Sequence, residues 1–289
     1  INAAKLFDYI FTCDINCINK YKKDCPNAKG IYSNPFFINM QSITKSAQHK
    51  EYGNDVLFAG SWYTRPHGSR SADMIELFDE CLKNKLKLHI IDRNSERNVM
   101  DIFPNKYADN LYHSVDYKDL LHNVHNQFEY VLNLNSVSNS ETMFARRIIE
   151  LLAQKKIVIS NYSPAINKYF KNLVFQKDDI KNILKLSFIQ KEIIKHNGYL
   201  QVYKYFTDKY FYNKFLNCLN KDKYKEYIIS SYKPKVSVIC CSNRINNLDI
   251  ILDNFNKQIY KNKELLICIN LDGKDISMSN IEKCKLNNN

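Results

Sequence analysis

The chain has 289 residues, enough for one large domain or two modest ones. Its 45% hydrophobic and 25% charged residues are typical of globular proteins, and its 6 glycines and 6 prolines exclude collagen-like and Pro/Gly-rich disordered chains. The net charge of +12 suits phosphates, nucleic acid or anionic lipid heads, although a solvated lysine-rich helical face is the simpler explanation.

Short apolar runs alternate with segments of helical periodicity along most of the chain. The predicted strands are 7–11, 30–32, 56–59, 86–91, 130–134 and 157–160. The predicted helices are 15–22, 73–83, 116–127 and 143–154, with a polar linker over 41–54. Strands that alternate with helices predict βαβ units and a parallel sheet with both faces covered.

The C-terminal third changes character twice. Residues 186–232 are aromatic and helical in pattern, with a predicted break at Asn197-Gly198 and an end at Lys233-Pro234. A strand (236–241), a helix (248–258) and a strand (264–270) follow as a second βαβ unit. Two strands and one helix cannot bury a full core, so we expect this unit to be incomplete.

The cysteines and the apolar runs restrict the cellular setting. Nine cysteines, scattered from Cys13 to Cys284 without a CxxC pair, predict reduced thiols and neither a disulfide framework nor a zinc site. No apolar run approaches the roughly 18–20 residues of a membrane span. No signal peptide is visible, but a start at Ile1 is what we expect of a fragment, so the missing signal is weak evidence for a cytoplasmic protein. We expect a cytoplasmic protein, with peripheral association at the inner face of the membrane left open.

Small residues follow the predicted strand 56–59. Ligands of open parallel sheets bind beyond the carboxyl ends of the strands. Gly60 and Ser61 would let backbone N–H groups approach an anion there, and Arg65 would add a positively charged fork. An ordinary tight turn with a surface arginine explains the same residues equally well.

Polar residues follow the next strand, 86–91. Asp92 and Arg93 could bond a nucleobase edge or a ribose. A capping loop with no ligand would have the same composition, so this signal is weak alone.

Residues 133–150 are the most informative stretch. The strand ends at Asn135, a polar loop follows, and a helix is predicted to open near Thr142, capped by Thr142 itself or by Ser140. The amino end of such a helix offers free N–H groups and a positive dipole to a phosphate.

The helical wheel divides this predicted helix into two faces. Phe144 and Ile148 share the buried face, whereas Arg146, Arg147 and Glu150 lie on the other side. A carboxylate accepts hydrogen bonds from a ribose diol, and arginine donates two to a diphosphate, which is the chemistry that a sugar nucleotide requires. Spacing alone slightly favours the alternative, a surface ion pair.

Other catalytic patterns are missing from the sequence. His122 and His125 lie three residues apart with no third ligand, so no metal site is predicted. There is no Ser-His-Asp or Cys-His arrangement, GxGxxG or Walker sequence, and no catalytic residue is assigned.

Four segments, in order over residues 6–220, resemble the CgeB-like (spore-maturation type) glycosyltransferases of the GT-B superfamily. They are FDYIFTCDINCINKYKKD, NDVLFAGSWYTR, HIIDRN and YVLNLNSVSNSETMFARRIIELLAQKKIVISNYSPAI. The most specific block is TMFARRIIELLA followed by VISNYS. The resemblance implies two Rossmann-like halves, with residues 1–49 as a remnant of the N-terminal half and linker, and residues 50–225 as the domain that binds the donor nucleotide.

The resemblance also implies roles for individual residues. Glu150 would bind the donor ribose, and the turn 141–144 would face the diphosphate with its backbone. The full expected donor site is Gly60, Ser61, Arg65, Asp92, Arg93, Asn135, Thr142, Met143, Phe144, Arg146, Arg147 and Glu150.

The tail, PKVSVICCSNRINNLDIILDNFNKQIYKNKELLICIN, resembles the opening of a family-2, GT-A-type glycosyltransferase. The resemblance implies that residues 226–289 are the truncated start of that domain, with Asn243 and Asp272 near a nucleotide. The metal-binding DxD and the catalytic acid of that family would lie further along, so a divalent metal is expected only for a complete domain.

The function that these resemblances imply is glycosyl transfer from a nucleotide-diphosphate sugar to a glycan or protein acceptor. The enzyme would be a metal-independent, cofactor-free bacterial hexosyltransferase of cell-envelope or spore-coat polysaccharide synthesis, with the activity of this fragment left open. The alternatives are a non-catalytic nucleotide or nucleotide-sugar binding module, a basic protein on nucleic acid or membrane, and a flavodoxin-like regulatory domain. Nucleic acid is not expected, because aromatic residues spaced like those of 199–225 usually lie in a core.

Overall fold

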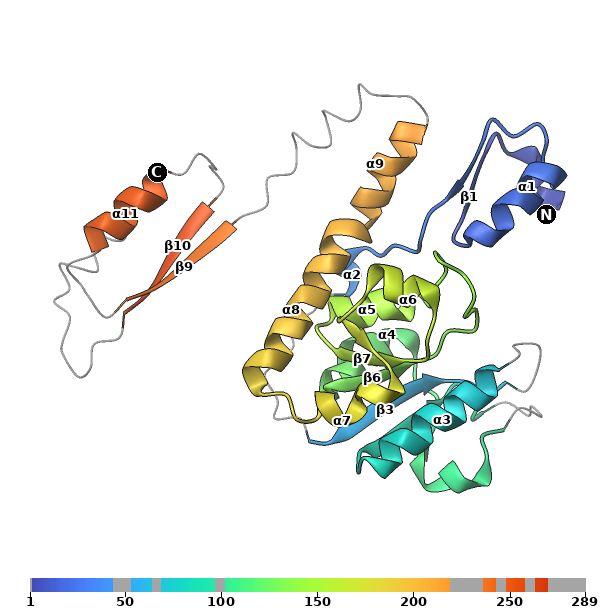
Figure 1. Ribbon diagram of the computed structural model, residues 1–289, viewed down its shortest axis with the longest axis horizontal. Helices are drawn as coiled ribbons and strands as arrows, with labels where there is room; N and C mark the ends of the chain where they lie inside the picture. Colours follow the sequence, from blue (N-terminus) through green and yellow to red (C-terminus); the bar gives the residue numbers. More distant parts are fainter. Residues whose placement is uncertain are drawn as a thin grey trace. The chain divides into compact units, whose positions relative to one another are not determined.

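The computed structural model of the chain (Figure 1) describes residues 2–43, 53–63, 69–96, 102–218, 236–242, 248–257 and 263–269. The chain divides into two compact units, Ile1–Asn220 (unit 1) and Lys221–Asn289 (unit 2). Strands and helices alternate in both units, which confirms the predicted α/β class. No helix among the described ranges is long and apolar enough to cross a bilayer.

The centre of unit 1 is a six-stranded parallel sheet. Its strands are β3 (Asp55–Gly60), β4 (Lys87–Asp92), β5 (Leu111–Tyr112), β6 (Tyr130–Asn133), β7 (Ile157–Ser160) and β8 (Val174–Phe175). They lie side by side in the order β5-β4-β3-β6-β7-β8, and every neighbouring pair is parallel. Counted along the chain this is 3-2-1-4-5-6, the order of the Rossmann fold, so the predicted Rossmann-like sheet is confirmed.

The helices of unit 1 vary in length and pitch. The α-helices are α1 (Ile18–Asp24), α2 (Met40–Ile43), α3 (Arg70–Lys83), α4 (Tyr117–Asp119), α5 (Arg147–Ala153), α6 (Pro164–Tyr169), α7 (Ile180–Ile183), α8 (Phe188–Tyr205) and α9 (Asp208–Cys218). The 3-10 turns are η1 (Asn2–Leu6), η2 (Ile15–Cys17), η3 (Asn105–Asn110), η5 (His125–Gln127) and η6 (Lys177–Asp179), and η4 (Leu120–Val124) is a π-turn. The predicted helix 116–127 is therefore one α-turn followed by a π-turn and a 3-10 turn.

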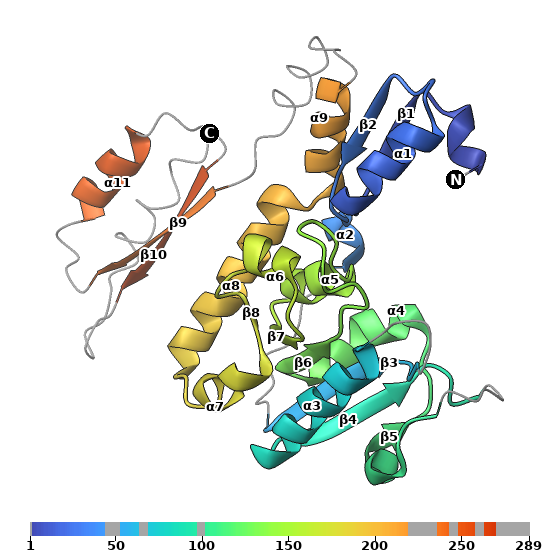
Figure 2. The same cartoon turned by 45° about the vertical axis from the view of Figure 1, so that its right-hand side comes forward.

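Both faces of the sheet are buried, as predicted. Val56 and Phe58 belong to the core under α3, whereas Leu57 and Ala59 belong to the core under α5 and α8. Figures 1 and 2 show α3 on one side of the sheet and α5 and α8 on the other. Burial on both faces explains why the strands read as almost continuous apolar runs in the sequence.

The helix predicted to open near Thr142 begins later, at Arg147. The hydroxyl of Ser140 accepts the amides of Thr142 (3.3 Å) and Met143 (3.1 Å), and Asn135 Oδ1 accepts the amide of Ala145 (2.8 Å). Side chains thus take the N–H groups that would start a helix, which keeps this segment a loop.

The predicted helix break at Asn197-Gly198 is wrong, because α8 runs through both residues. A Cβ on Gly198 would lie only 2.9 Å from Leu152 Cδ2, so the glycine allows α8 to pack closely on α5. The break falls after Tyr205, where the backbone of Ile38 pairs with Thr207.

The first 33 residues form a parallel strand pair, β1 (Tyr9–Thr12) and β2 (Gly30–Ser33), joined through η2 and α1. The strands and the helix predicted there are confirmed with small shifts of their ends. Thr142 fixes this pair to the loop before α5, because its hydroxyl donates to Cys13 O (2.9 Å) and accepts the amide of Ile15 (2.9 Å).

Unit 2 contains the predicted second βαβ arrangement. β9 (Val236–Ser242) and β10 (Lys263–Ile269) pair in parallel, with α11 (Leu248–Asn256) between them in the chain.

A chain that ends at Asn220 is expected to keep the stability of unit 1, because both apolar cores lie entirely within that unit. Trp62, the chain's one tryptophan, is buried in unit 1, so its fluorescence in a urea titration reports the unfolding of this unit. We expect the free energies of unfolding of the two chains to agree within about 0.5 kcal/mol. A broad or lost transition in the shortened chain would show that unit 2 is an integral part of one fold.

Candidate functional site

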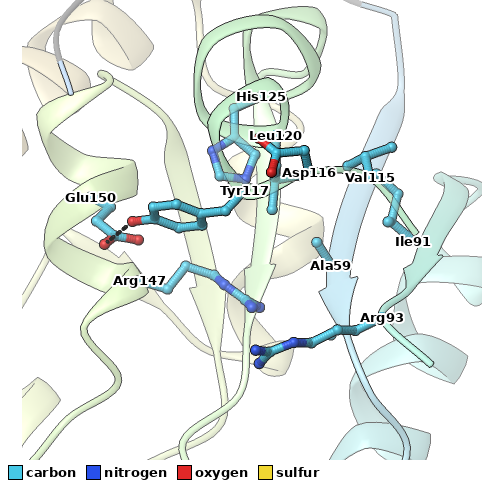
Figure 3. A pocket seen from close by; sticks show the side chains of 11 residues that line it. Ala59, Ile91, Arg93, Val115, Asp116, Tyr117, Leu120, His125, Arg147 and Glu150 are labelled. Atoms are coloured by element: carbon cyan, nitrogen blue, oxygen red, sulfur yellow. Dashed lines mark hydrogen bonds between the residues drawn. The ribbon is translucent and has the colours of Figure 1, made fainter. Parts of the chain in front are cut away.

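A cavity of about 540 Å³ lies at the carboxyl ends of β3 and β4. Its lining consists of Ala59, Gly60, Ile91, Arg93, Val115, Asp116, Tyr117, Leu120, His125, Arg147 and Glu150 (Figure 3). β4, which follows β3 in the chain, pairs with one side of β3, and the later strand β6 pairs with the other side. The strand order therefore reverses at β3. Open α/β sheets bind their ligands at such a switch point.

Positive charge gathers at one end of the cavity. Arg147, the first residue of α5, and Arg93, just after β4, extend their guanidinium groups toward each other in Figure 3. No hydrogen bond or ion pair joins the side chain of Arg147 to any residue of the described ranges. Burial lowers the pKa of Arg147, the charge of Glu150 opposes this shift, and repulsion from Arg70 and Arg93 adds to it. A half-buried guanidinium without a partner favours an anionic ligand.

Gly60 makes room for this arrangement. A Cβ at Gly60 would lie 2.9 Å from the ring of Phe58 and 3.8 Å from Arg147 Nη1. The same guanidinium lies 6.0 Å from the centroid of the Phe58 ring. Because Gly60, the glycine predicted at the strand end, has no side chain, the guanidinium of Arg147 can extend past it into the cavity.

Arg70 holds the chain just after β3. It is 7% exposed, and its Nη1 donates to the carbonyl of Ser61 (3.1 Å) while its guanidinium lies over the ring of Tyr63. Ser61 itself is buried and does not line the cavity. Ser61 therefore helps to hold the loop after β3 through its backbone carbonyl, which accepts from Arg70.

The same helix, α5, also brings a buried carboxylate to the cavity. Glu150 is 5% exposed, and its Oε1 accepts from the hydroxyl of Tyr117 (2.6 Å) and lies 3.2 Å from Arg146 Nε. Burial and this hydrogen bond raise the pKa of Tyr117 to about 12, so the phenol remains a donor. The prediction that Glu150 lies on a solvent face is wrong, because Tyr117 and the cavity wall cover it. The ion pair that spacing alone favoured is present, with Arg146, the residue just before α5.

His125 presents a single buried acceptor to the cavity. Its Nδ1 lies 2.8 Å from Gln154 Oε1, and the amide nitrogen of Gln154 donates to the carbonyl of Leu121. Because this fixes the orientation of Gln154, the hydrogen-bond network assigns the proton to Nδ1. Nε2 then carries a lone pair and has no partner among the described residues. Burial lowers the pKa of His125 to about 4, so the ring is neutral near pH 7.

His125→Phe is expected to remove part of the pH dependence of stability. The pKa of His125 is about 4 in the folded chain and 6.5 ordinarily, so near pH 5 the unfolded chain binds a proton that the folded chain does not. The folded state of the parent therefore loses about 2 kcal/mol between about pH 7.5 and pH 5 through this residue. Urea unfolding followed by Trp62 fluorescence at both pH values measures the loss.

The exposed His113 offers the matched control for this experiment. His113→Phe should keep the pH dependence of the parent chain. An equal pH dependence in His125→Phe and the parent would contradict a buried, neutral His125.

Several predicted donor-site residues lie away from the cavity lining. Phe144 is 1% exposed and packs edge to face against Phe170 and Phe206 in the core. The amides of Thr142 and Met143 are bonded to Ser140, so the structure does not offer them to a phosphate.

The remaining predicted residues have local partners. Asp92 Oδ1 accepts the amide of Asn94 (2.9 Å) and thus caps the turn after β4. Asn135 bonds the backbone of Ala145. Arg146 is exposed and pairs with Glu150. The predicted Arg65, Asn243 and Asp272 lie outside the described residues.

Sequence reasoning missed three contributors: Arg70, Tyr117 and His125. His125 was weighed only as a metal ligand, and Tyr117 only as part of a helix. Their position on the segment that joins β5 to β6 was the available signal. Within the described part of the chain, no group of three or more His, Cys, Asp or Glu side chains could hold a metal ion.

Comparisons with known proteins found no close match. No family model matches the chain, and neither does any curated protein. One similar solved structure is the crystal structure of an alpha1,3-fucosyltransferase, which is 19% identical with a TM-score of 0.27. The likeness covers 53% of this chain and 38% of the other, so the chain spans well under half of that protein's length. At this level of likeness the reaction has to be inferred from the cavity itself, and the resemblances to CgeB-like and family-2 enzymes stay predictions.

Proposed function

We propose that unit 1 binds a nucleotide-diphosphate sugar in the cavity at the switch point and transfers the sugar to an acceptor. The observation that carries this proposal is the pairing of two opposite chemistries in one cavity. The guanidinium of Arg147, which has no hydrogen bond or ion pair with any described residue, suits a diphosphate, and the buried carboxylate of Glu150 suits the hydroxyls of a ribose.

The remaining wall suits a nucleobase. Ile91, Val115 and Leu120 offer an apolar surface for a flat ring, and His125 Nε2 can accept a hydrogen bond from an N–H group of the base. The three parts of a nucleoside diphosphate would thus each have a matching surface.

The chemistry would rest on positioned charge. When the sugar leaves, negative charge builds up on the diphosphate, and Arg147 with Arg93 would stabilise it from fixed positions. Such a reaction needs no metal, and the main contribution of the protein would be to hold donor and acceptor in register. The proposed acceptor is a glycan or protein of the cell-surface type.

A second candidate is a nucleotide or nucleotide-sugar binding module without catalysis. The acids that line the cavity favour it, because both have partners within the chain. Asp116 caps α4 through the amide of Lys118 (2.8 Å), and Glu150 is held by Tyr117 and Arg146. Neither carboxylate is poised as a general base in this arrangement.

A thermal-shift panel of UDP, GDP, CDP, ADP and TDP tests the shared first step. One nucleotide at about 100 times its dissociation constant should stabilise unit 1 by about 2.7 kcal/mol. Release of that nucleotide from its sugar conjugate, with acceptor glycans added, separates an enzyme from a binding module. No shift with any of the five would overturn both candidates.

A further inference from the structure

A second cavity, of about 520 Å³, shares no lining residue with the first. It lies in unit 1, where the segment between β2 and α2 meets the junction of α8 and α9. The amide of Ile38 donates to Phe206 O (2.9 Å), and the amide of Asp208 donates to Ile38 O (3.0 Å). Figures 1 and 2 both show α2 beside this junction. These two backbone hydrogen bonds therefore fix the segment between β2 and α2 to the junction beside the cavity.

Aromatic rings make up much of the wall. Phe37 and Phe211 stack with centroids 4.3 Å apart, and Tyr205 lies edge to face with Tyr210 at 6.0 Å. Phe37, Tyr205 and Tyr210 remain 38%, 39% and 41% exposed, so part of each residue is open to a ligand. The negative face of an aromatic ring attracts weakly positive C–H groups.

Two amide side chains add polar contacts. Asn34 is 8% exposed, and its Nδ2 donates to Pro35 O (2.9 Å), which fixes the orientation of the amide. Its Oδ1 is buried and has no hydrogen-bond partner among the described residues. Gln201 Nε2 donates to Tyr169 O (2.7 Å), so its Oε1 is the second acceptor beside the aromatic wall. The buried Asn34 Oδ1, without a partner among the described residues, calls for a ligand that carries O–H or N–H donors.

None of the described residues that line this cavity is acidic, and the one lysine, Lys214, donates to the carbonyl of Ser33. Burial lowers the pKa of Lys214, which disfavours its charged form. The described lining thus holds no carboxylate that would select a cation, and its one lysine is already bonded to a backbone carbonyl. A pyranose ring has a C–H face, which can pack on an aromatic ring, and hydroxyl donors at its rim, which can bond to the amide oxygens. It therefore complements both kinds of wall.

We propose that this second cavity binds a neutral saccharide, with the C–H face of one sugar ring on Tyr210 and its hydroxyls bonded to Asn34 and Gln201. The proposal goes beyond donor binding and rests on different residues, so either can fail without the other.

The test uses the full chain on an array of uncharged oligosaccharides built from glucose, galactose, mannose and N-acetylglucosamine. Titration of the best binder then compares the parent with Tyr210→Ala and Gln201→Met. We expect Tyr210→Ala to weaken binding about tenfold through loss of the ring. Gln201→Met, which keeps the side-chain length, should weaken it about three- to tenfold. Nucleotide binding should be unchanged in both.

Tyr212 is the matched control, since it is 48% exposed on the same helix α9 but does not line the cavity. Tyr212→Ala should bind the saccharide like the parent. Trp62 fluorescence confirms that each variant is folded. The proposal is overturned if no oligosaccharide of the array binds, if Tyr212→Ala weakens binding as much as Tyr210→Ala, or if folded Tyr210→Ala and Gln201→Met both bind like the parent.

Discussion

Arg147→Lys is expected to weaken the binding of nucleoside diphosphates by about ten- to a hundredfold and to leave the binding of nucleosides unchanged. The range corresponds to loss of a hydrogen bond to a charged group. Lysine keeps the charge but loses the planar fork that can hold two diphosphate oxygens at once. The fold should survive, because the Arg147 side chain has no hydrogen bond with any described residue, and a lysine stem can lie along Phe58 in its place.

Arg146→Lys is the matched control for this experiment. Arg146 is the neighbouring residue, it is exposed, and an ammonium there can still pair with Glu150. Isothermal titration of both variants with a diphosphate and its nucleoside separates the possibilities. Equal losses in the two variants, or equal losses for the diphosphate and the nucleoside, would show that Arg147 has only a structural role.

Glu150→Gln should weaken nucleotide binding by a similar factor, about ten- to a hundredfold. The loss should come from the ribose and not from the diphosphate. The amide keeps an oxygen for the hydroxyl of Tyr117 while it removes the charge that strengthens hydrogen bonds from a ribose. Binding of inorganic pyrophosphate, which has no ribose, should therefore change little.

Tyr117→Phe extends the test of Glu150. It removes the 2.6 Å hydrogen bond that orients the carboxylate, so we expect a smaller loss of affinity, about threefold to tenfold. Affinities of Glu150→Gln equal to those of the parent would rule out the ribose assignment. A parallel loss for pyrophosphate would show that Glu150 supports the whole site and does not bind the ribose specifically.

The strands and the fold class could be predicted because burial on both faces leaves continuous apolar runs in the sequence. The shortest strands could not. β5 and β8 have two residues each, too few for any periodicity to register. The start of α5 was missed for a different reason: Ser140 and Asn135 take backbone amides that a helical pattern assigns to the first turn.

The site was predictable where it depends on strand ends and not where it depends on distant contacts. Gly60 and Arg93 follow from the rule that ligands bind at carboxyl ends, whereas Arg147 and Glu150 were expected from the helical wheel and the family resemblance. The structure places all four in the lining of one cavity. The hydrogen bond between Tyr117 and Glu150 joins residues 33 positions apart. No local pattern announces such a contact.

The strand order also matters for synthesis on the ribosome. β3 lies at the centre of the sheet, but its partner on one side, β6, follows it in the chain only after α3, β4 and β5. While residues 60–129 are being made, that edge of β3 exposes unpaired N–H and C=O groups beside apolar side chains. A nascent chain at this stage can pair with a neighbouring one. Residues 130–133 end the exposure of β3, and the open edge then moves outward to β6 until β7 is made.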